Sequence, residues 1–188
     1  SCPRRPGSSW SCSSSPSRTA KDRGCRLPPV APIAVKGAVK IETVRETRIG
    51  AYGICVQDGM ILVIKKARGP YKGLYDLPGG GVEFGESPPE TVVREFLEET
   101  GTRVAVCELL GAFSRVSTFV ADTGTHLVEL HHLGFLYRVT GGSLTAIKAG
   151  PDGHDSLGAV WLPLTEARPD AVSPLVSEGL RCIGLDLT

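Results

Sequence analysis

Along most of the chain, apolar residues recur with the two-residue period of β-strands, and two segments change to the helical period. The strand-like segments, which glycine, proline or aspartate residues separate, are 49–56, 60–65, 82–84, 103–120, 126–140 and 159–162. The helical segments are 88–100, which Ser87 can cap and Gly101 can end, and 173–182, which begins with a Ser-Pro pair. Strands on both sides of a helix, followed by a second helix, predict a layered α/β domain around a mixed β-sheet.

Turn residues add three local predictions. Asp58-Gly59 is a typical turn pair and predicts that the first two strands form a hairpin. Gly111 interrupts a long strand-like run and predicts a kink or a bulge. Asp122-Thr123-Gly124 predicts the turn that joins the runs on either side of it.

The helical segment 88–100 has an unusual acidic face. At 100° per residue, Glu95, Glu98 and Glu99 share one face of the helix. The residues of a different, apolar face are Val92, Val93, Phe96 and Leu97. Like charges at these spacings destabilise a bare helix by a few tenths of a kcal/mol per pair, about 0.2–0.5. This arrangement favours a bound hard cation such as Mg²⁺, which takes oxygen ligands, over the alternative of a solvated acidic face.

The acidic helix lies within a longer motif. Eight residues fit the spacing Gly-x5-Glu-x7-Arg-Glu-φ-x-Glu-Glu-x-Gly-φ, in which φ is a bulky aliphatic residue: Gly80, Glu86, Arg94, Glu95, Phe96, Glu98, Glu99 and Gly101. This pattern resembles the Nudix box, and the preceding segment 73–80 is similar to the family's lead-in. Phe96 is an acceptable though less usual occupant of the first φ position, and Thr102 departs from the last one. The resemblance implies a Nudix-type α/β/α sandwich around a mixed β-sheet.

The resemblance also implies an activity. Nudix hydrolases cleave a phosphoanhydride bond in a nucleoside diphosphate linked to another moiety, with Mg²⁺ as cofactor and Mn²⁺ as a substitute. The first choice of substrate is a nucleoside triphosphate, as in MutT-like pyrophosphohydrolases, because Ser117 stands where ADP-ribose hydrolases have a proline. ADP-ribose or a nucleotide sugar is the alternative substrate. A non-catalytic nucleotide-binding module is the alternative from another functional class.

Site residues follow from the match to the box. The implied metal ligands are the carbonyl of Gly80 and the carboxylates of Glu95, Glu98 and Glu99. The residues assigned to catalysis are Glu98, Glu99, Arg94 and Asp155. Arg94 is expected to hold the carboxylates, with Glu86 as its anchor, rather than to touch substrate. Asp155 is the first choice for an additional acid, with Asp152 next, and both also suit a turn.

Substrate contacts are less well defined by the pattern. The residues assigned to them are Lys65, Arg68, Phe84 and Glu129. The candidates for stacking on a base, all of which also suit a hydrophobic core, are Tyr71, Phe84, Phe113 and Phe119. His131 and His132 point to opposite faces of their strand, so they cannot form one metal site, and hydrogen-bonded strand histidines are the expected alternative.

The first 33 of the 188 residues differ from the rest in composition. They are rich in Ser, Pro and Arg, which predicts a disordered basic tail (1–33) ahead of the Nudix domain (34–188). Six of the 21 Lys and Arg residues but only one of the 20 Asp and Glu residues precede residue 30, so the remainder is mildly acidic. This charge distribution argues against nucleic acid as a partner and leaves a nucleotide-type small molecule.

The compartment and the assembly are predicted more loosely. No apolar run reaches the roughly 18 residues that cross a membrane, so we expect no membrane association. Cys55, Cys107 and Cys182 stand singly in apolar surroundings, which predicts free thiols and a cytoplasmic location. An organelle transit peptide remains the alternative interpretation of the tail. A homodimer is left open.

Overall fold

The computed structural model describes residues 42–141, 147–151, 153 and 155–187. Its elements are β1 (Thr43–Ile54), β2 (Val56–Gln57), β3 (Met60–Lys66), β4 (Tyr75–Asp76), β5 (Gly79–Gly81), α1 (Pro88–Glu95), the π-helical turn η1 (Phe96–Thr100), β6 (Val104–Val120), β7 (Leu127–Gly141), β8 (Ser156–Pro163), the 3₁₀ turn η2 (Leu164–Glu166) and α2 (Pro174–Cys182). The tail 1–33 and Asp152 lie outside the described residues, so the predictions for them stay predictions.

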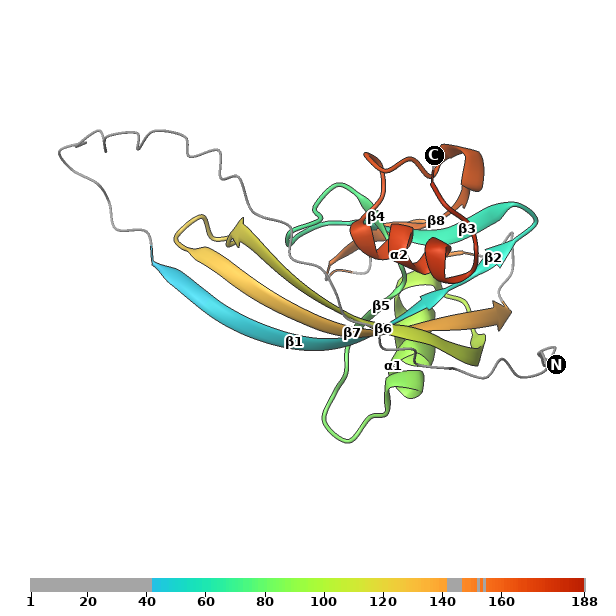
Figure 1. Cartoon of the computed structure of the whole chain (residues 1–188), viewed down its shortest axis with the longest axis horizontal. Helices are drawn as coiled ribbons and strands as arrows, with labels where there is room; N and C mark the ends of the chain where they lie inside the picture. Colours follow the sequence, from blue (N-terminus) through green and yellow to red (C-terminus); the bar gives the residue numbers. More distant parts are fainter. Residues whose placement is uncertain (1–41, 142–146, 152, 154, 188) are drawn as a thin grey trace, which may run out of the picture. The chain divides into compact units, whose positions relative to one another are not determined.

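The strands are divided between two sheets (Figure 1). The first has the order β5-β1-β7-β6, in which β1 and β7 are parallel and the other pairs are antiparallel, so it is the mixed sheet that the sequence predicts. The second contains β2, β3 and β4 in that order, with β8 paired to β3, and all its pairs are antiparallel.

Helices cover both faces of the strands, and β3 shows this most directly. Ile61 and Val63 belong to one buried hydrophobic cluster, together with Leu175, Val176 and Leu180 of α2. The intervening Leu62 and Ile64 belong to a second cluster, together with Val92 of α1 and Phe96 of η1. Alternate residues of a strand therefore face different helices, which is the arrangement of an α/β/α sandwich.

The local predictions have mixed outcomes. Gly111 is at a register shift between β6 and β7, so the predicted bulge is confirmed, and the predicted turn at 122–124 joins these two strands. The hairpin prediction is wrong in extent, because β1 ends at Ile54 and only the two residues of β2 pair with β3. The segment 82–84 is not a strand, since β5 comprises Gly79–Gly81.

The helix ahead of Gly101 begins and ends as predicted but changes its winding. The carboxylate of Glu90 accepts a hydrogen bond from the Ser87 amide at 2.9 Å, which is half of a capping box. The final residues 96–100 form a π-helical turn, and Gly101 ends it with a φ of 71°, a left-handed conformation that favours glycine.

Two other predictions concern thiols and membranes. Cys55 and Cys182 are free thiols, whereas Cys107 is disulfide-bonded, so the prediction of free thiols is wrong at that position. Within the part of the chain that the structure describes, every helix is too short or too polar to cross a bilayer.

Candidate functional site

The glycine strand β5 packs directly against the acidic helix. A Cβ atom on Gly80 would lie 2.2 Å from Oε1 of Glu95, far inside a normal contact, so this carboxylate lies directly against the β5 backbone. Register with β1 fixes the strand, because Gly80 pairs with Ala51. Glycine at position 80 therefore allows the Glu95 carboxylate to approach the β5 backbone this closely, and any larger residue would displace it, which explains one residue of the motif physically.

Arg94 connects the carboxylates of this region. Its Nε and Nη2 donate hydrogen bonds to the two oxygens of Glu86, both at 2.9 Å, and its Nη1 donates to Glu95 at 2.8 Å. Weaker contacts reach Glu98 at 3.5 Å and the carbonyl of Gly81 at 3.1 Å. The hydrogen bonds from Arg94 lower the pKa of Glu86 to about 2. A planar fork with this many donors restricts the rotamers of all three glutamates.

The three glutamates of the acidic face differ in burial. Glu99 is only 2% exposed, and its Oε2 accepts a hydrogen bond from the Gly79 amide at 2.9 Å. Burial raises the pKa of Glu99 well above its usual value, and burial likewise raises that of Glu95 against the opposing effect of Arg94. The Glu98 side chain, by contrast, is 58% exposed. The winding into η1 thus buries one carboxylate and leaves its neighbour in solvent.

This donor set fits a hard divalent cation. Among the described residues, no three carboxylate, imidazole or thiolate groups form a ready-made metal cluster. Yet Glu99 is a buried acid without an ion-pair partner within 4.0 Å among the described side chains, and burying an unpaired charge is costly. A cation that shared the oxygens of Glu95, Glu99 and the β5 backbone would remove that cost.

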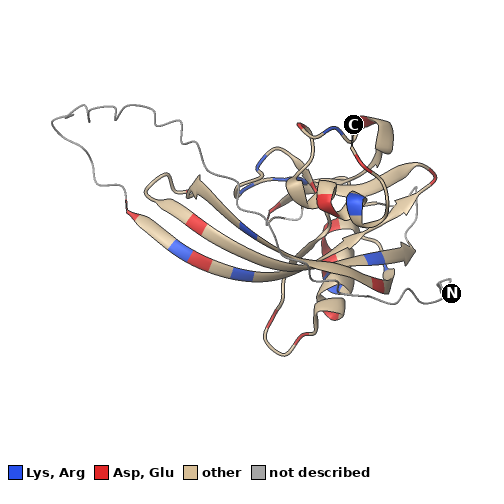
Figure 2. Ribbon diagram, in the orientation of Figure 1, with Lys and Arg blue, Asp and Glu red and all other residues tan. Residues whose placement is uncertain are grey.

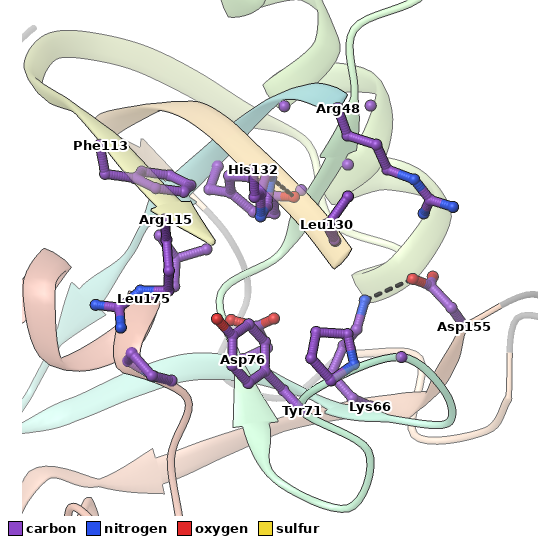
Figure 3. A pocket seen from close by; sticks show the side chains of 18 of the residues that line it. Arg48, Lys66, Tyr71, Asp76, Phe113, Arg115, Leu130, His132, Asp155 and Leu175 are labelled. Atoms are coloured by element: carbon purple, nitrogen blue, oxygen red, sulfur yellow. Dashed lines mark hydrogen bonds and ion pairs between the residues drawn. The ribbon is translucent and has the colours of Figure 1, made fainter. Parts of the chain in front are cut away.

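A cavity of about 500 Å³ opens beside β5 (Figure 3). Its lining comes from β1, β4, β5, β6, β7, the end of β3 and the loop after it, the residue before β8 and the start of α2. The lining includes all three β5 glycines and both polar and aromatic side chains, among them Tyr52, Asp76, Phe113 and His132. Its size is within the range of about 300–1,000 Å³ that is usual for small-molecule sites.

An ion pair between two lining residues, Lys66 and Asp155, places charge in this cavity. Nζ of Lys66 is 2.5 Å from Oδ2 of Asp155, and the Lys66 side chain is only 15% exposed. Burial lowers the pKa of Lys66, but the charges of Asp155 and Asp76 outweigh it, so the net shift is upward. The structure therefore brings Asp155 to the cavity, paired with a lysine that the sequence analysis did not select.

An aromatic wall lines another side of the cavity. The Tyr52 hydroxyl lies 2.9 Å from Nε2 of His132, and the rings of Phe113 and His132 are 5.0 Å apart, edge to face. Burial, together with Lys66 and Arg48, lowers the pKa of His132 to about 4. The neighbouring His131 instead lies 2.9 Å from Oγ of Ser114 and does not line the cavity. The two histidines are hydrogen-bonded strand residues.

Three of the residues expected to contact substrate lie away from the cavity. Lys65 lies over the ring of Tyr75 at 4.6 Å, and Phe84 is fully exposed. Glu129 pairs with Arg45 at 2.6 Å, on the long strands where charges of both signs alternate (Figure 2). The residues of the expected sets that do line the cavity are Arg68, Tyr71, Phe113 and Phe119.

Residues that the sequence analysis missed also line the cavity, notably Arg48, Lys66 and Asp76. Lys66 was missed because Lys65 and Lys66 alternate on one strand, and the pattern does not say which of the two faces a site. For Asp76 a signal existed, because an acidic residue between the strand-forming Tyr75 and Leu77 is unusual in a buried strand.

This chain is similar in sequence to proteins that bear functional names. An ADP-ribose pyrophosphatase of Methanocaldococcus jannaschii is 41% identical over 104 residues, which are 55% of this chain and 56% of that protein. A putative 8-oxo-dGTP diphosphatase of Bacillus subtilis is 35% identical over 114 residues, 60% of this chain and 64% of that protein. This chain thus spans between half and two thirds of the length of these two relatives.

Structural and family comparisons cover more of the chain. The crystal structure of a MutT NUDIX hydrolase from Burkholderia pseudomallei is similar with a TM-score of 0.57 and 26% identity, over 73% of this chain and 98% of that one. The family model for the NUDIX domain matches residues 45–178, most of the chain and all of the site described above. The chain therefore belongs to the NUDIX family.

Proposed function

We propose that this protein is a hydrolase that cleaves a phosphoanhydride bond of a nucleotide, with a nucleoside triphosphate as the substrate of first choice and Mg²⁺ as the cofactor. The observation that carries the proposal is the juxtaposition of the buried Glu99, the Glu95 carboxylate and the β5 backbone at the edge of a cavity of about 500 Å³. A diphosphate seated along β5 would lie beside these carboxylates, while the cavity accepts the nucleoside.

Each residue of the site has a distinct part in this proposal. Glu95, Glu99 and the Gly80 carbonyl would hold the cation, with Glu98 as a further ligand or as the base that accepts the proton of the attacking water. A bound divalent cation supplies neutralisation of phosphate charge and a lowered pKa for water. Arg94 orients the carboxylates through its hydrogen bonds and does not touch the substrate.

Lys66 and Asp155 complete the phosphate side of the site. The buried Lys66 ammonium can donate charge-assisted hydrogen bonds to phosphate oxygens. Its ion pair with Asp155 holds the ammonium in place. When a phosphate oxygen approaches Lys66, Asp155 is free to accept a proton or to bind water. The partly exposed Asp155 and the buried Lys66 thus form a pair that substrate can separate.

ADP-ribose is the second candidate, because the 41% identical relative of M. jannaschii is named as an ADP-ribose pyrophosphatase. The two substrate classes share the diphosphate and differ in what lies beyond it. A nucleoside triphosphate would yield a nucleoside monophosphate and pyrophosphate, whereas ADP-ribose would yield AMP and ribose 5-phosphate. Product analysis therefore separates the two without any change in the protein.

The test is a hydrolysis assay of the purified chain against nucleoside triphosphates, ADP-ribose and nucleotide sugars, with Mg²⁺ or Mn²⁺ and with chelator. Glu99→Gln keeps the size of the side chain and should reduce kcat by orders of magnitude. Glu90→Gln is the matched control, because Glu90 is exposed, lies on the same helix and caps it, and glutamine also fits the capping box. Glu90→Gln should retain wild-type kcat.

Two outcomes would contradict the proposal. One is nucleotide turnover by Glu99→Gln at the wild-type rate. The other is binding of nucleotides by the wild-type protein with no turnover of any member of the panel, which would make the chain a nucleotide-binding module instead.

A further inference from the structure

Asp76, the last residue of β4, is a buried acid at the cavity that the chemistry above does not use. It is only 4% exposed, and it lines the cavity. Figure 3 shows Asp76 on one side of the cavity and His132 with Phe113 on the opposite side. A carboxylate this deeply buried requires partners for its oxygens.

One of its two oxygens has them. Oδ1 of Asp76 accepts a hydrogen bond from the Leu77 amide at 2.9 Å and another from the Ser173 hydroxyl at 2.6 Å. The same hydroxyl oxygen caps α2 by accepting hydrogen bonds from the amides of Leu175 and Val176, at 3.2 Å and 3.3 Å. The Ser173 hydroxyl proton is therefore donated to Asp76. The Leu77 amide and Ser173, at the start of α2, together hold the carboxylate in a fixed orientation.

The other oxygen is left for the cavity. None of the hydrogen bonds or ion pairs among the described residues reaches Oδ2 of Asp76, and the nearby Lys66 is paired with Asp155. Oδ2 is also not fully buried. Among the described residues, the fully buried side-chain oxygen or nitrogen that lacks a hydrogen-bond partner is Oγ1 of Thr102, so the unpaired Oδ2 of Asp76 retains some exposed surface. Oδ2 is thus an oriented acceptor that faces the space where the substrate would lie.

We propose that Asp76 selects the nucleobase by accepting a hydrogen bond from an exocyclic amino group, while the base packs against Phe113 and His132. This inference rests on the function proposed above and names its specificity. At an exocyclic position a carboxylate oxygen accepts an N–H but repels a keto oxygen, so the amino group of adenine, guanine or cytosine is favoured there over the keto oxygen of uracil, thymine or hypoxanthine. Stacking on aromatic side chains is tolerant of base identity and therefore leaves the choice to Asp76.

Matched nucleotide pairs test the proposal on the wild-type protein. GTP and ITP differ only by the 2-amino group, and ATP and CTP present amino groups where ITP and UTP present keto oxygens. We expect kcat/KM to be at least about tenfold higher for an amino-bearing base than for its keto partner, because a site built to bind an N–H rejects the analogue that lacks it. Equal kcat/KM values within every pair would overturn the proposal.

Asp76→Asn gives the sharper test. Since two donors hold Oδ1, the amide keeps its oxygen there and places its NH₂ group where Oδ2 was, which changes an acceptor into a donor. The preference should therefore reverse toward ITP and UTP. Asp58→Asn is the matched control, because Asp58 lies in the exposed β2–β3 turn and asparagine tolerates its φ of 50°. If the role of Asp76 were purely structural, Asp76→Asn would change stability and leave the ratio of kcat/KM between paired nucleotides unaltered.

Binding of nucleosides without phosphates separates this inference from the proposed function. Calorimetric titration with guanosine, adenosine and inosine requires neither metal nor turnover. Tighter binding of the amino nucleosides, without hydrolysis of any nucleotide, would refute the proposed function and support the role of Asp76. Hydrolysis of nucleotides with no preference within the pairs would do the reverse. If Asp76→Asn does not fold, the wild-type pairs decide.

Discussion

Gly80→Ala adds one methyl group between β5 and the acidic helix, and its effect can be worked out from a single contact. The new Cβ would lie 2.2 Å from Oε1 of Glu95, and an ordinary contact begins at 3.4 Å, so the carboxylate must retreat by about 1.2 Å. Misplacement of a catalytic group by about 1 Å can cost about 10²-fold in rate. We therefore expect kcat to fall about 100-fold and Mn²⁺ affinity to fall between about 10- and 100-fold.

Global stability should change little in the same variant. The atoms that must move are the end of a flexible side chain, and the φ of Gly80 is not in the left-handed region, so alanine fits the backbone. Loss of the hydrogen bond from Arg94 to Glu95, worth about 1 kcal/mol at a partly exposed site, is offset by about 0.4–1 kcal/mol from reduced entropy of the unfolded chain. The free energy of unfolding should stay within about 1 kcal/mol of wild type.

Gly81→Ala is the matched control, since nothing lies within 4 Å of a Cβ at the next position and its φ is also not left-handed. Mn²⁺ binding measured by electron paramagnetic resonance, kcat, and urea unfolding should each be recorded for both variants. Equal Mn²⁺ affinity in the wild type and Gly80→Ala would refute the role of Glu95 as a ligand. Equal losses in Gly80→Ala and Gly81→Ala would refute the contact argument, because only one of them meets the carboxylate.

Three further predictions concern stability and the arginine. Thr102→Val should raise the free energy of unfolding by about 1–2 kcal/mol in urea titrations, because Oγ1 of Thr102 is the buried polar side-chain atom that lacks a partner in the described structure; a loss of stability would show that this hydroxyl is satisfied. The pKa of His132 is lowered to about 4 from an ordinary 6.5, so the unfolded state binds more protons between these values and stability falls as pH drops from 6.5 to 4. This contribution to the free energy of unfolding is about 3 kcal/mol at most. In His132→Gln the pH dependence of urea unfolding should flatten by about this amount, and an unchanged pH profile would contradict the lowered pKa of His132. Arg94→Lys should lower kcat by about 10- to 100-fold with a smaller effect on KM, because one ammonium cannot reproduce the two hydrogen bonds to Glu86 and the one to Glu95; steady-state kinetics with wild-type values would disprove the positioning role.

The sequence by itself determined the unit around the motif. Residues 88–100 form a continuous helix because its signals are local: a capping box at Ser87 and a left-handed glycine at Gly101. The expected partnership of Arg94 with Glu86 also appears in the structure, since an eight-residue spacing across a loop and a helix start leaves few alternatives. The bulge at Gly111 and a layered α/β domain followed from the same kind of local pattern, whereas the α/β/α arrangement was implied by the resemblance to the Nudix box.

Only the tertiary structure decided which side chains meet at the cavity. Asp155 reaches Lys66 across 89 positions, and Ser173 reaches Asp76 across 97, and no periodicity encodes such pairs. Lys65 and Glu129 were selected from strand-like segments but do not line the cavity, because strand alternation fixes that neighbours face opposite sides without fixing which side holds the site. Phe84 lies in the segment 82–84, which is not a strand, and is fully exposed. Local signals depend on a few adjacent dihedral angles, whereas the site depends on strand register, and register is set by packing over the whole domain.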